Sequence, residues 1–364
     1  MKRLLCLMSN MNAGGAETFL MKLYREIDRT QYQMDFCVNV QEKNYYEDEI
    51  NELGGNIFRI PARSEGLKEH NRQLAKLIKN KQYKYVLIVS ASSTAYLDAY
   101  IAKKSGAKKC IIRSSNSKNG SFGLKNIIEH ILKKLFNHCA DVLIAPSDLA
   151  AKNLFGDKFE KDKRFKYLNN GLDLSLYRFY MDERNRIRRK HNISDDTLVI
   201  GHIGRFNGQK NHLFLVDIIA ELSKRENAIL IFVGNGDLKE EIRKKVSDIG
   251  LSEKVIFAGL SSEVASYLSA MDVFVFPSFY EGMPNTVIEA QANGIPCVIS
   301  DAITKNANVT GLVTYLPLAS GVGTWVDTIL QMAGKRQINA EKMLAAAGYE
   351  IKDCAKQFVG LCFD

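Results

Sequence analysis

Short apolar runs alternate with stretches that carry apolar residues at helical spacing along almost the whole chain. Amphipathic segments that predict helices separate the apolar runs. This alternation predicts parallel sheets joined by right-handed crossovers, the architecture of doubly wound α/β domains. The strands expected in the first half are Leu4–Met8, Met34–Val40, Asn56–Ile60, Val86–Val89, Lys109–Arg113 and Val142–Ala145.

The second half repeats this alternation after a segment rich in turn residues, Leu168–Tyr177, which we expect to be the linker. At 364 residues the chain is longer than one ordinary domain. We therefore predict two Rossmann-like domains, residues 1–170 and 171–345, and a final helical stretch, Asn339–Leu361.

Two glutamates, Glu281 and Glu289, lie on either side of the point where the apolar strand Asp272–Pro277 gives way to a helix. Open α/β sheets bind ligands at such junctions. Backbone N–H groups at the positive end of the helix form a candidate anion site that would fit a diphosphate, with the carboxylates taking hydroxyls of two sugars, one a ribose. The alternative is a solvated loop glutamate and an ordinary helix-face glutamate. The expected donors are Gly282, Met283, Asn285 and Thr286, since Pro284 has no N–H.

Two cations follow the upstream strand that ends at Gly204. Arg205 and Lys210 stand on the loop and the first turn of a helix expected at Asn211–Ser223. Glycine lets a ligand approach the main chain, and Arg and Lys bind phosphate oxygens. Unmatched cations at a helix start are unfavourable unless an anion joins them, so the pattern indicates a negative ligand. The alternative is a pair of solvated basic residues.

Glycine turns follow two further strands of the second half. Gly234 and Gly236 come after Ile229–Val233, and Gly259 comes after Val255–Ala258. They free backbone groups at the same edge of the sheet, although any doubly wound domain uses glycine in such turns.

Taken together, these segments resemble the retaining glycosyltransferases of family four, and their order and spacing span almost the whole chain. The run Gln291–Asp301 and the tail Ala347–Lys352 look most like the bacterial branch that builds capsular, exopolysaccharide and O-antigen chains. The matching segments are Gly14–Glu17, Asn170–Asp173, Gly204–Asn211, Val233–Asp237, Tyr267–Asp272 and Pro277–Asn285.

The resemblance implies the GT-B fold, with an acceptor-binding N-terminal domain, a nucleotide-sugar-binding C-terminal domain, a cleft between them and a terminal helix, 346–364, that crosses back to the first domain. It also implies transfer of a hexose or N-acetylhexosamine, with retention, from a UDP-sugar to a polyprenyl-diphosphate-linked saccharide. In the front-face route of this family a donor phosphate oxygen takes the acceptor's proton.

The same resemblance assigns roles to residues. Arg205 and Lys210 would hold the diphosphate, Glu281 would contact the transferred sugar, and Glu289 would bind the ribose. The glycine loop of Gly14 and Gly15 would close on phosphate and sugar, and Gly259 with Leu260 would border the base.

One segment departs from the family pattern. Many relatives place histidines at the end of the strand that corresponds to Cys110–Asn116, where this chain has Arg113, Ser114 and Ser115. Either Arg113, Ser115 or Asn116 makes the sugar contact, or turnover is slow, or activity is lost. For Arg113 the alternative is an ion pair with a carboxylate at the strand end that matters only for stability. Two other hypotheses therefore stay open: a nucleotide-sugar epimerase of the same fold, and a catalytically silent paralogue. His202 and His212 belong to the other half and are expected to be structural or surface histidines.

Composition and short motifs indicate the cellular compartment and the cofactors to expect. The seven cysteines form no Cys-x-x-Cys pair, which predicts apolar fillers in a reducing, cytoplasmic compartment. The chain has no Asp-x-Asp pair, so we expect no metal and no other cofactor. We interpret the apolar start as a buried strand rather than a signal peptide, and no apolar run has the length of a spanning helix.

A net charge of +9 calls for an explanation. The lysines are spread over helix faces without a nucleic-acid motif, so we expect no nucleic-acid partner. The amphipathic stretch Gly120–Asn137 carries Lys125, Lys133 and Lys134 after Lys118. Packing on its own sheet is the favoured explanation of its apolar stripe, and the alternative is that the helix lies on the anionic inner face of a cell membrane.

Overall fold

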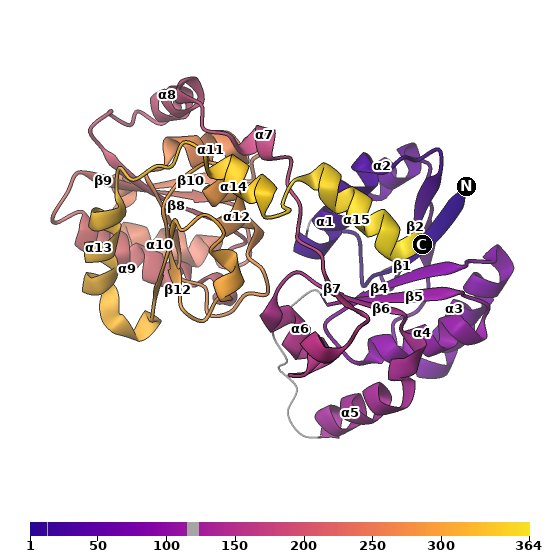
Figure 1. The fold of residues 1–364 in the computed structure, drawn as a ribbon. Helices are drawn as coiled ribbons and strands as arrows, with labels where there is room; N and C mark the ends of the chain where they lie inside the picture. Colours follow the sequence, from indigo (N-terminus) through magenta and orange to yellow (C-terminus); the bar gives the residue numbers. More distant parts are fainter. Residues whose placement is uncertain (13, 115–123) are drawn as a thin grey trace. The chain divides into compact units, whose positions relative to one another are not determined.

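The protein is described by a computed structural model that covers residues 1–12, 14–114 and 124–364. The chain forms two compact units (Figure 1). The first comprises Met1–Leu172 together with Gly348–Asp364, and the second comprises Asp173–Ala347. The boundary at Leu172 falls inside the turn-rich segment expected to be the linker.

The first unit holds a seven-stranded sheet of order β3-β2-β1-β4-β5-β6-β7, with every neighbouring pair parallel. All six strands predicted in the first half are confirmed. The sequence did not predict β7, because three residues are too few to show a periodicity. The strands are β1 (Lys2–Leu7), β2 (Tyr32–Val38), β3 (Ile57–Arg59), β4 (Tyr85–Ser90), β5 (Lys109–Ser114), β6 (Val142–Ala145) and β7 (Phe165–Tyr167).

Helices on both faces bury the apolar strands of this sheet. They are α1 (Gly15–Glu26), α2 (Glu47–Glu52), α3 (Leu67–Lys81), α4 (Thr94–Lys104), α5 (Leu124–Phe136), α6 (Asp148–Phe155) and the terminal α15 (Ile351–Phe363).

The terminal helix α15 belongs to the first unit, as the expected crossover requires. Its residues Ile351, Phe358 and Phe363 share a core with Leu4 of β1 and Phe19 of α1, and Figure 1 shows α15 beside α1. The prediction of a single helical stretch at Asn339–Leu361 was wrong in one respect.

That stretch divides into two helices. The helix is interrupted between α14 (Ala340–Ala346), which belongs to the second unit, and α15. Gly348 there has φ +77°, a left-handed conformation that ends helices and suits glycine.

The second unit holds a six-stranded parallel sheet of order β10-β9-β8-β11-β12-β13. Its strands are β8 (Leu198–Ile203), β9 (Ala228–Val233), β10 (Val255–Gly259), β11 (Val273–Phe276), β12 (Cys297–Ser300) and β13 (Val313–Leu316). Its helices are α7 (Leu174–Tyr177), α8 (Met181–Lys190), α9 (His212–Leu222), α10 (Lys239–Asp248), α11 (Val264–Ala270), α12 (Asn285–Ala292), α13 (Gly321–Met332) and α14.

Both sheets reverse their strand order at one place. In the first sheet β1 lies between β2 and β4, and in the second β8 lies between β9 and β11. Connections leave in opposite directions at such a switch point, which opens a crevice at the carboxyl ends of the two central strands. The fold therefore offers one site beyond β1 and β4 and another beyond β8 and β11.

Two expectations from composition concern the whole chain. All seven cysteines are buried and none forms a disulfide, which agrees with their interpretation as apolar fillers. Within the part of the chain that the structure describes, no helix is both long and apolar enough to cross a membrane.

Candidate active site

The loops that follow β8 and β11 meet at the switch point of the second sheet. The backbone N–H of Phe279 donates to the carbonyl oxygen of Gln209 at 2.9 Å, and Gln209 Nε2 donates to the carbonyl oxygen of Tyr280 at 2.8 Å. Gln209 thus joins the two loops. Sequence reasoning gave Gln209 no role, although it stands inside the Gly204–Asn211 motif.

The loops bring Lys210 and Glu281 together. Lys210 Nζ lies 2.7 Å from Glu281 Oε1, and the two side chains are only 16% and 11% exposed. The ammonium group also lies 4.5 Å from the centre of the Phe276 ring, in cation–π contact. The prediction that Lys210 is an unmatched cation was therefore wrong, because a carboxylate from the neighbouring loop neutralises it.

Lys210 also lies outside the helix where it was expected. A 3-10 turn, Gly208–Lys210, precedes α9, and Asn211 between them has φ 55°. The turn holds the lysine over the end of β11, where it reaches Glu281.

Arg205 is in a different environment. Its side chain is 68% exposed, and its Nη2 lies 3.5 Å from Oδ2 of Asp237, which is 85% exposed. Exposed ion pairs of this kind are weak and easily exchanged. The arginine fork can therefore leave Asp237 for a stronger anion.

Glu289 lies on the second turn of α12 and is buried. Its carboxylate accepts a hydrogen bond from the hydroxyl of Tyr177, at the end of α7. Burial, together with this carboxylate, raises the pKa of Tyr177 far above its ordinary value. Tyr177 was not among the predicted site residues, and the only signal in the sequence is its place just after the Asn170–Asp173 motif.

The segment between the two glutamates closes the loop over the strand. Gly282 and Met283 are buried, whereas Asn285 and Thr286 at the start of α12 are half-buried. Pro284 is the residue before the helix and supplies no N–H donor. The segment 282–286, which was expected to supply N–H donors, therefore leads from Glu281 of the Lys210–Glu281 pair into α12.

The glycine turns after β8, β9 and β10 are bound to one another through the backbone. Gly204 N donates to Val233 O at 3.0 Å, and Gly234 N donates to Gly259 O at 2.8 Å. A side chain at Gly234 would stand 2.1 Å from the Gly204 carbonyl oxygen, so close packing of two turns accounts for this glycine. Leu260 next to them is 80% exposed, which leaves it available to a ligand.

Two buried histidines lie under the cationic loop. The proton on Nδ1 of His202 is donated to the carbonyl oxygen of Val275 at 3.0 Å, and the ring of His212 stacks on Phe206 with centres 4.2 Å apart. Burial lowers the pKa of both rings, that of His212 to about 4 with a further contribution from Lys210. Both are therefore neutral packing groups, in line with the structural role expected for them.

In the first unit Gly14 is the N-cap of α1 and Gly15 is its first residue. Arg113 makes structural contacts, although its partners are Phe19 and Asn170 rather than a carboxylate. Its side chain is 1% exposed, its guanidinium lies 4.4 Å from the centre of the Phe19 ring, and it donates to the amide oxygen of Asn170. Burial lowers its pKa to about 10. Arg113 thus makes its contacts within its own unit, which favours a structural role.

The two other residues suggested for the sugar contact, Ser115 and Asn116, lie outside the described residues. Across the described ranges, no group of three or more His, Cys, Asp or Glu side chains is arranged to hold a metal ion.

Comparison with known families and relatives identifies the chain. Residues 183–311 match the family described as Glycosyl transferases group 1, and residues 5–147 match Glycosyl transferase 4-like. A Bacillus subtilis protein, EpsF, whose name describes it as a glycosyltransferase, is 34% identical over 370 residues, covering 99% of this chain and 94% of the relative.

Two other relatives have more specific names. The capsular polysaccharide biosynthesis glycosyltransferase CapH of Staphylococcus aureus is 24% identical and covers 93% of this chain and 92% of its own. The UDP-Gal:alpha-D-GlcNAc-diphosphoundecaprenol alpha-1,3-galactosyltransferase of Escherichia coli is 22% identical and covers 73% and 70%.

Among solved structures, HepE of Anabaena in complex with UDP and glucose superposes with a TM-score of 0.77 at 19% identity, covering 99% of each chain. This similarity confirms the predicted GT-B fold of two Rossmann-like units. The relative EpsF, 34% identical across 99% of this chain, and the two family matches show that the chain belongs to the group 1 glycosyltransferases.

Proposed function

We propose that this glycosyltransferase moves a hexose or N-acetylhexosamine from a UDP-sugar to a lipid-linked saccharide, with retention, in cell-surface polysaccharide synthesis. The observation that carries the proposal is the buried Lys210–Glu281 pair at the switch point, a cation and a carboxylate side by side. The names of the three relatives and of the UDP complex support the donor, the acceptor and the pathway class. They favour neither an epimerase nor a silent paralogue.

The Lys210–Glu281 pair can bind a nucleotide-sugar because each side chain can make further hydrogen bonds. An ammonium group has three N–H donors, so Lys210 can hold Glu281 Oε1 and still donate to diphosphate oxygens. Glu281 Oε2 can accept from a hydroxyl of the transferred sugar. Arg205, held only loosely by Asp237, would add a fork to the diphosphate.

Glu289 lies at the other end of the segment that starts at Glu281, and there it would accept hydrogen bonds from the ribose hydroxyls. The hydrogen bond from Tyr177 fixes one orientation of its carboxylate before the ligand arrives. Preorganisation of this kind lowers the entropy lost on binding. The nucleotide would thus be held by the second unit.

Retention is supported by how the two carboxylates are used. Inversion needs a general base near the acceptor hydroxyl. Glu281 is paired with Lys210, and Glu289 accepts from Tyr177. A front-face route, in which a donor phosphate oxygen takes the acceptor's proton, needs neither as a base, and the protein then acts by positioning and by stabilising the leaving diphosphate.

Metal independence follows from the same cations. Many transferases neutralise the diphosphate with a divalent ion held by carboxylates. Here Lys210 and Arg205 would supply the positive charge, and the sequence has no Asp-x-Asp pair.

The acceptor proposal includes contact with the inner face of the cell membrane from the cytoplasm. On α5, Ile131 and Leu135 are 48% and 55% exposed and stand one turn apart, beside the exposed Lys134. Apolar side chains flanked by lysine favour an anionic lipid surface. Co-sedimentation with vesicles of anionic and of neutral lipid tests this contact.

The experiment that tests the function is a donor panel. The protein is melted with UDP-glucose, UDP-galactose, their N-acetylhexosamine counterparts and the corresponding GDP-sugars, and transfer to GlcNAc-diphosphoundecaprenol is then measured with each donor that stabilises it. Stabilisation by UDP-sugars and formation of a lipid-linked disaccharide are expected. Stabilisation by no nucleotide-sugar at all would overturn the proposal.

A further inference from the structure

Gln209 bridges the two loops that carry the Lys210–Glu281 pair. Its side-chain Nε2 donates to the carbonyl oxygen of Tyr280 at 2.8 Å, and its own carbonyl oxygen accepts from the backbone N–H of Phe279 at 2.9 Å. Gln209 directly precedes Lys210 in the chain, and Tyr280 directly precedes Glu281. Each residue of the pair is therefore adjacent in sequence to a residue that is bonded to the opposite loop.

The loop after β8 depends on this bridge because the bonds within the loop are weaker. The turn Gly208–Lys210 has three residues, and the N–H of Lys210 lies 3.3 Å from both the backbone and the side-chain oxygen of Asn207. Both distances exceed those of the two Gln209 bonds, and longer hydrogen bonds are weaker. Asn211, which follows the turn, has φ 55°, a left-handed conformation that is uncommon outside glycine. The bonds to the loop after β11 therefore fix the position of Lys210 better than the bonds within its own loop.

An amide side chain suits the bridge because it donates a hydrogen bond without carrying a charge. Lys210 Nζ and Glu281 Oε1 already neutralise each other at 2.7 Å. A lysine or arginine in place of Gln209 would compete with Lys210 for the carboxylate, and a glutamate would add a second negative charge beside Glu281. The neutral amide joins the loops and leaves the charge balance of the pair unchanged.

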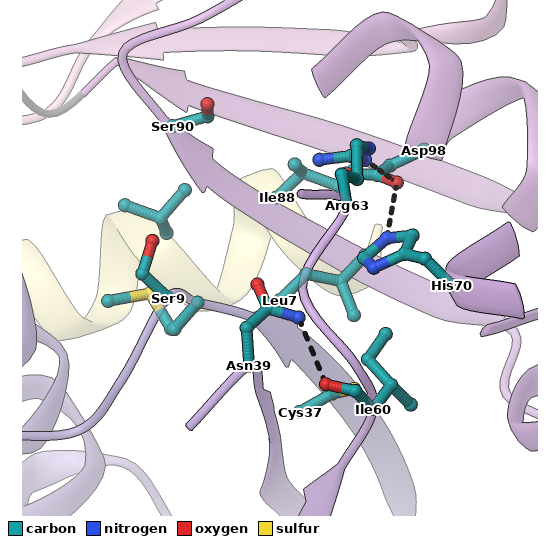
Figure 2. A pocket seen from close by; sticks show the side chains of 12 residues that line it. Leu7, Ser9, Cys37, Asn39, Ile60, Arg63, His70, Ile88, Ser90 and Asp98 are labelled. Atoms are coloured by element: carbon teal, nitrogen blue, oxygen red, sulfur yellow. Dashed lines mark hydrogen bonds and ion pairs between the residues drawn. The ribbon is translucent and has the colours of Figure 1, made fainter. Parts of the chain in front are cut away.

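The first unit contains a bridge of the same kind, which gives a comparison. In a cavity of that unit, Asn39 Nδ2 donates to the carbonyl oxygen of Ile60 and joins the ends of β2 and β3 (Figure 2). The distance is 3.4 Å, which is longer than a usual N–H···O bond. The bond from Gln209 to Tyr280 is shorter, and a second bond joins the same two loops. The bridge at the Lys210–Glu281 pair is therefore the stronger of the two.

We propose that Gln209 is a positioning residue for sugar transfer, which holds Lys210 and Glu281 in register for the nucleotide-sugar. This role rests on the proposed function, in which Lys210 binds the diphosphate and Glu281 binds the transferred sugar. Groups held in place before the reaction need no rearrangement, and small displacements of such groups slow a reaction strongly. Because Gln209 acts through the pair, its loss should affect the rate of transfer more than the binding of UDP, which Glu289 also supports.

Gln209→Met tests the role because it removes the amide and keeps an unbranched side chain of similar length. The backbone N–H of Phe279, which is bonded to Gln209 in the wild type, should exchange with deuterium about tenfold faster, the scale of one lost hydrogen bond. Transfer at saturating nucleotide-sugar should slow about tenfold, with UDP affinity near that of the wild type. Gln331→Met is the matched control, because Gln331 is exposed on α13 and lies outside both loops. Either exchange or transfer at the wild-type level in folded Gln209→Met overturns the proposal.

A double-mutant cycle shows whether Gln209 acts through the pair. Gln209→Met should slow transfer strongly in the wild type and only slightly in Glu281→Gln, where the pair is already disrupted. Equal losses in both backgrounds would show that Gln209 acts elsewhere and would refute the positioning role. If Gln209→Met does not fold, Gln209→Glu takes its place, since an ionised carboxylate has no hydrogen to donate.

Hydrogen exchange separates this role from the proposed function, because the exchange of Phe279 is measured without any substrate. A wild type that binds no nucleotide-sugar would contradict the proposed function. Exchange at Phe279 that Gln209→Met leaves unchanged, in a wild type that does bind a nucleotide-sugar, would overturn the role of Gln209 and leave the proposed function standing.

Discussion

Lys210 Nζ and Glu281 Oε1 lie 2.7 Å apart, although the two residues come from loops after different strands. Both side chains are largely buried, so removing either residue leaves the charge of the other unpaired and poorly solvated. A diphosphate can restore the balance after loss of the carboxylate but not after loss of the lysine. The pair therefore predicts asymmetric effects of its two single substitutions.

Lys210→Ala should lower transfer on the order of 10²-fold, the scale of losing one preorganised donor. Arg205→Ala should have a smaller effect, because its side chain is exposed and less preorganised. Transfer rates at saturating donor check this order. Lys224→Ala is the control, since Lys224 also pairs with a carboxylate but is 70% exposed. Wild-type turnover in Lys210→Ala would remove the lysine from the site.

Substitutions of Glu289 and Glu281 should have different effects, one on UDP affinity and the other on sugar transfer. Glu289→Ala should weaken UDP itself, whereas Glu281→Gln should leave UDP affinity near wild type and reduce transfer. Tyr177→Phe should weaken UDP about fivefold, because Glu289 loses the hydrogen bond that orients it. Isothermal titration with UDP measures all three. Equal losses of UDP affinity in both glutamate variants would mean that the roles are misassigned.

Arg113 should matter for stability. Arg113→Ala removes a fully buried side chain from contact with Phe19 and Asn170, which should lower the free energy of unfolding by roughly 3 kcal/mol. UDP affinity of the folded protein should not change. Thermal melting alongside a transfer assay decides the matter. An intact melting temperature with lost transfer would return Arg113 to the site.

The buried histidines predict acid sensitivity. The pKa of His212 falls from 6.5 to about 4 on folding, and that of His202 falls well below 6.5. The unfolded chain therefore binds more protons than the folded one below about pH 6.5, so stability is full above that pH and is lost as the pH falls toward 4. The contribution of His212 is roughly 3 kcal/mol across that window.

Calorimetric melting between pH 4 and 7 checks this dependence. His212→Phe keeps a ring against Phe206 and should flatten the profile. A melting temperature that the substitution leaves equally pH-dependent would show that His212 does not titrate in this window.

Chelation gives a further test. With Lys210 and Arg205 supplying the positive charge, EDTA should leave transfer intact. Activity that disappears with EDTA and returns with Mn²⁺ or Mg²⁺ would contradict the proposal that the two cations suffice.

The strands and the crossover topology were predictable because buried parallel strands are nearly continuous apolar runs, and Cys110–Ile112 and Val142–Ala145 are such runs. The site motifs were predictable as positions at strand ends. The pairing of Lys210 with Glu281 was not, because it depends on the hydrogen bonds of Gln209 between two loops.

Two other residues show the same limit. The sequence left Arg113 between a contact with the sugar and a structural role in an ion pair at the strand end. Its stacking on Phe19 exists only once α1 covers the sheet. The link between Tyr177 and Glu289 is also tertiary, since it joins α7 to α12.

A crystal structure of the protein with UDP tests the central claim most directly. The account predicts the diphosphate between the loops after β8 and β11, with an oxygen in hydrogen-bond contact with Lys210 Nζ and the ribose hydroxyls on Glu289. UDP bound elsewhere in the chain, or a diphosphate that makes no contact with Lys210, would contradict it.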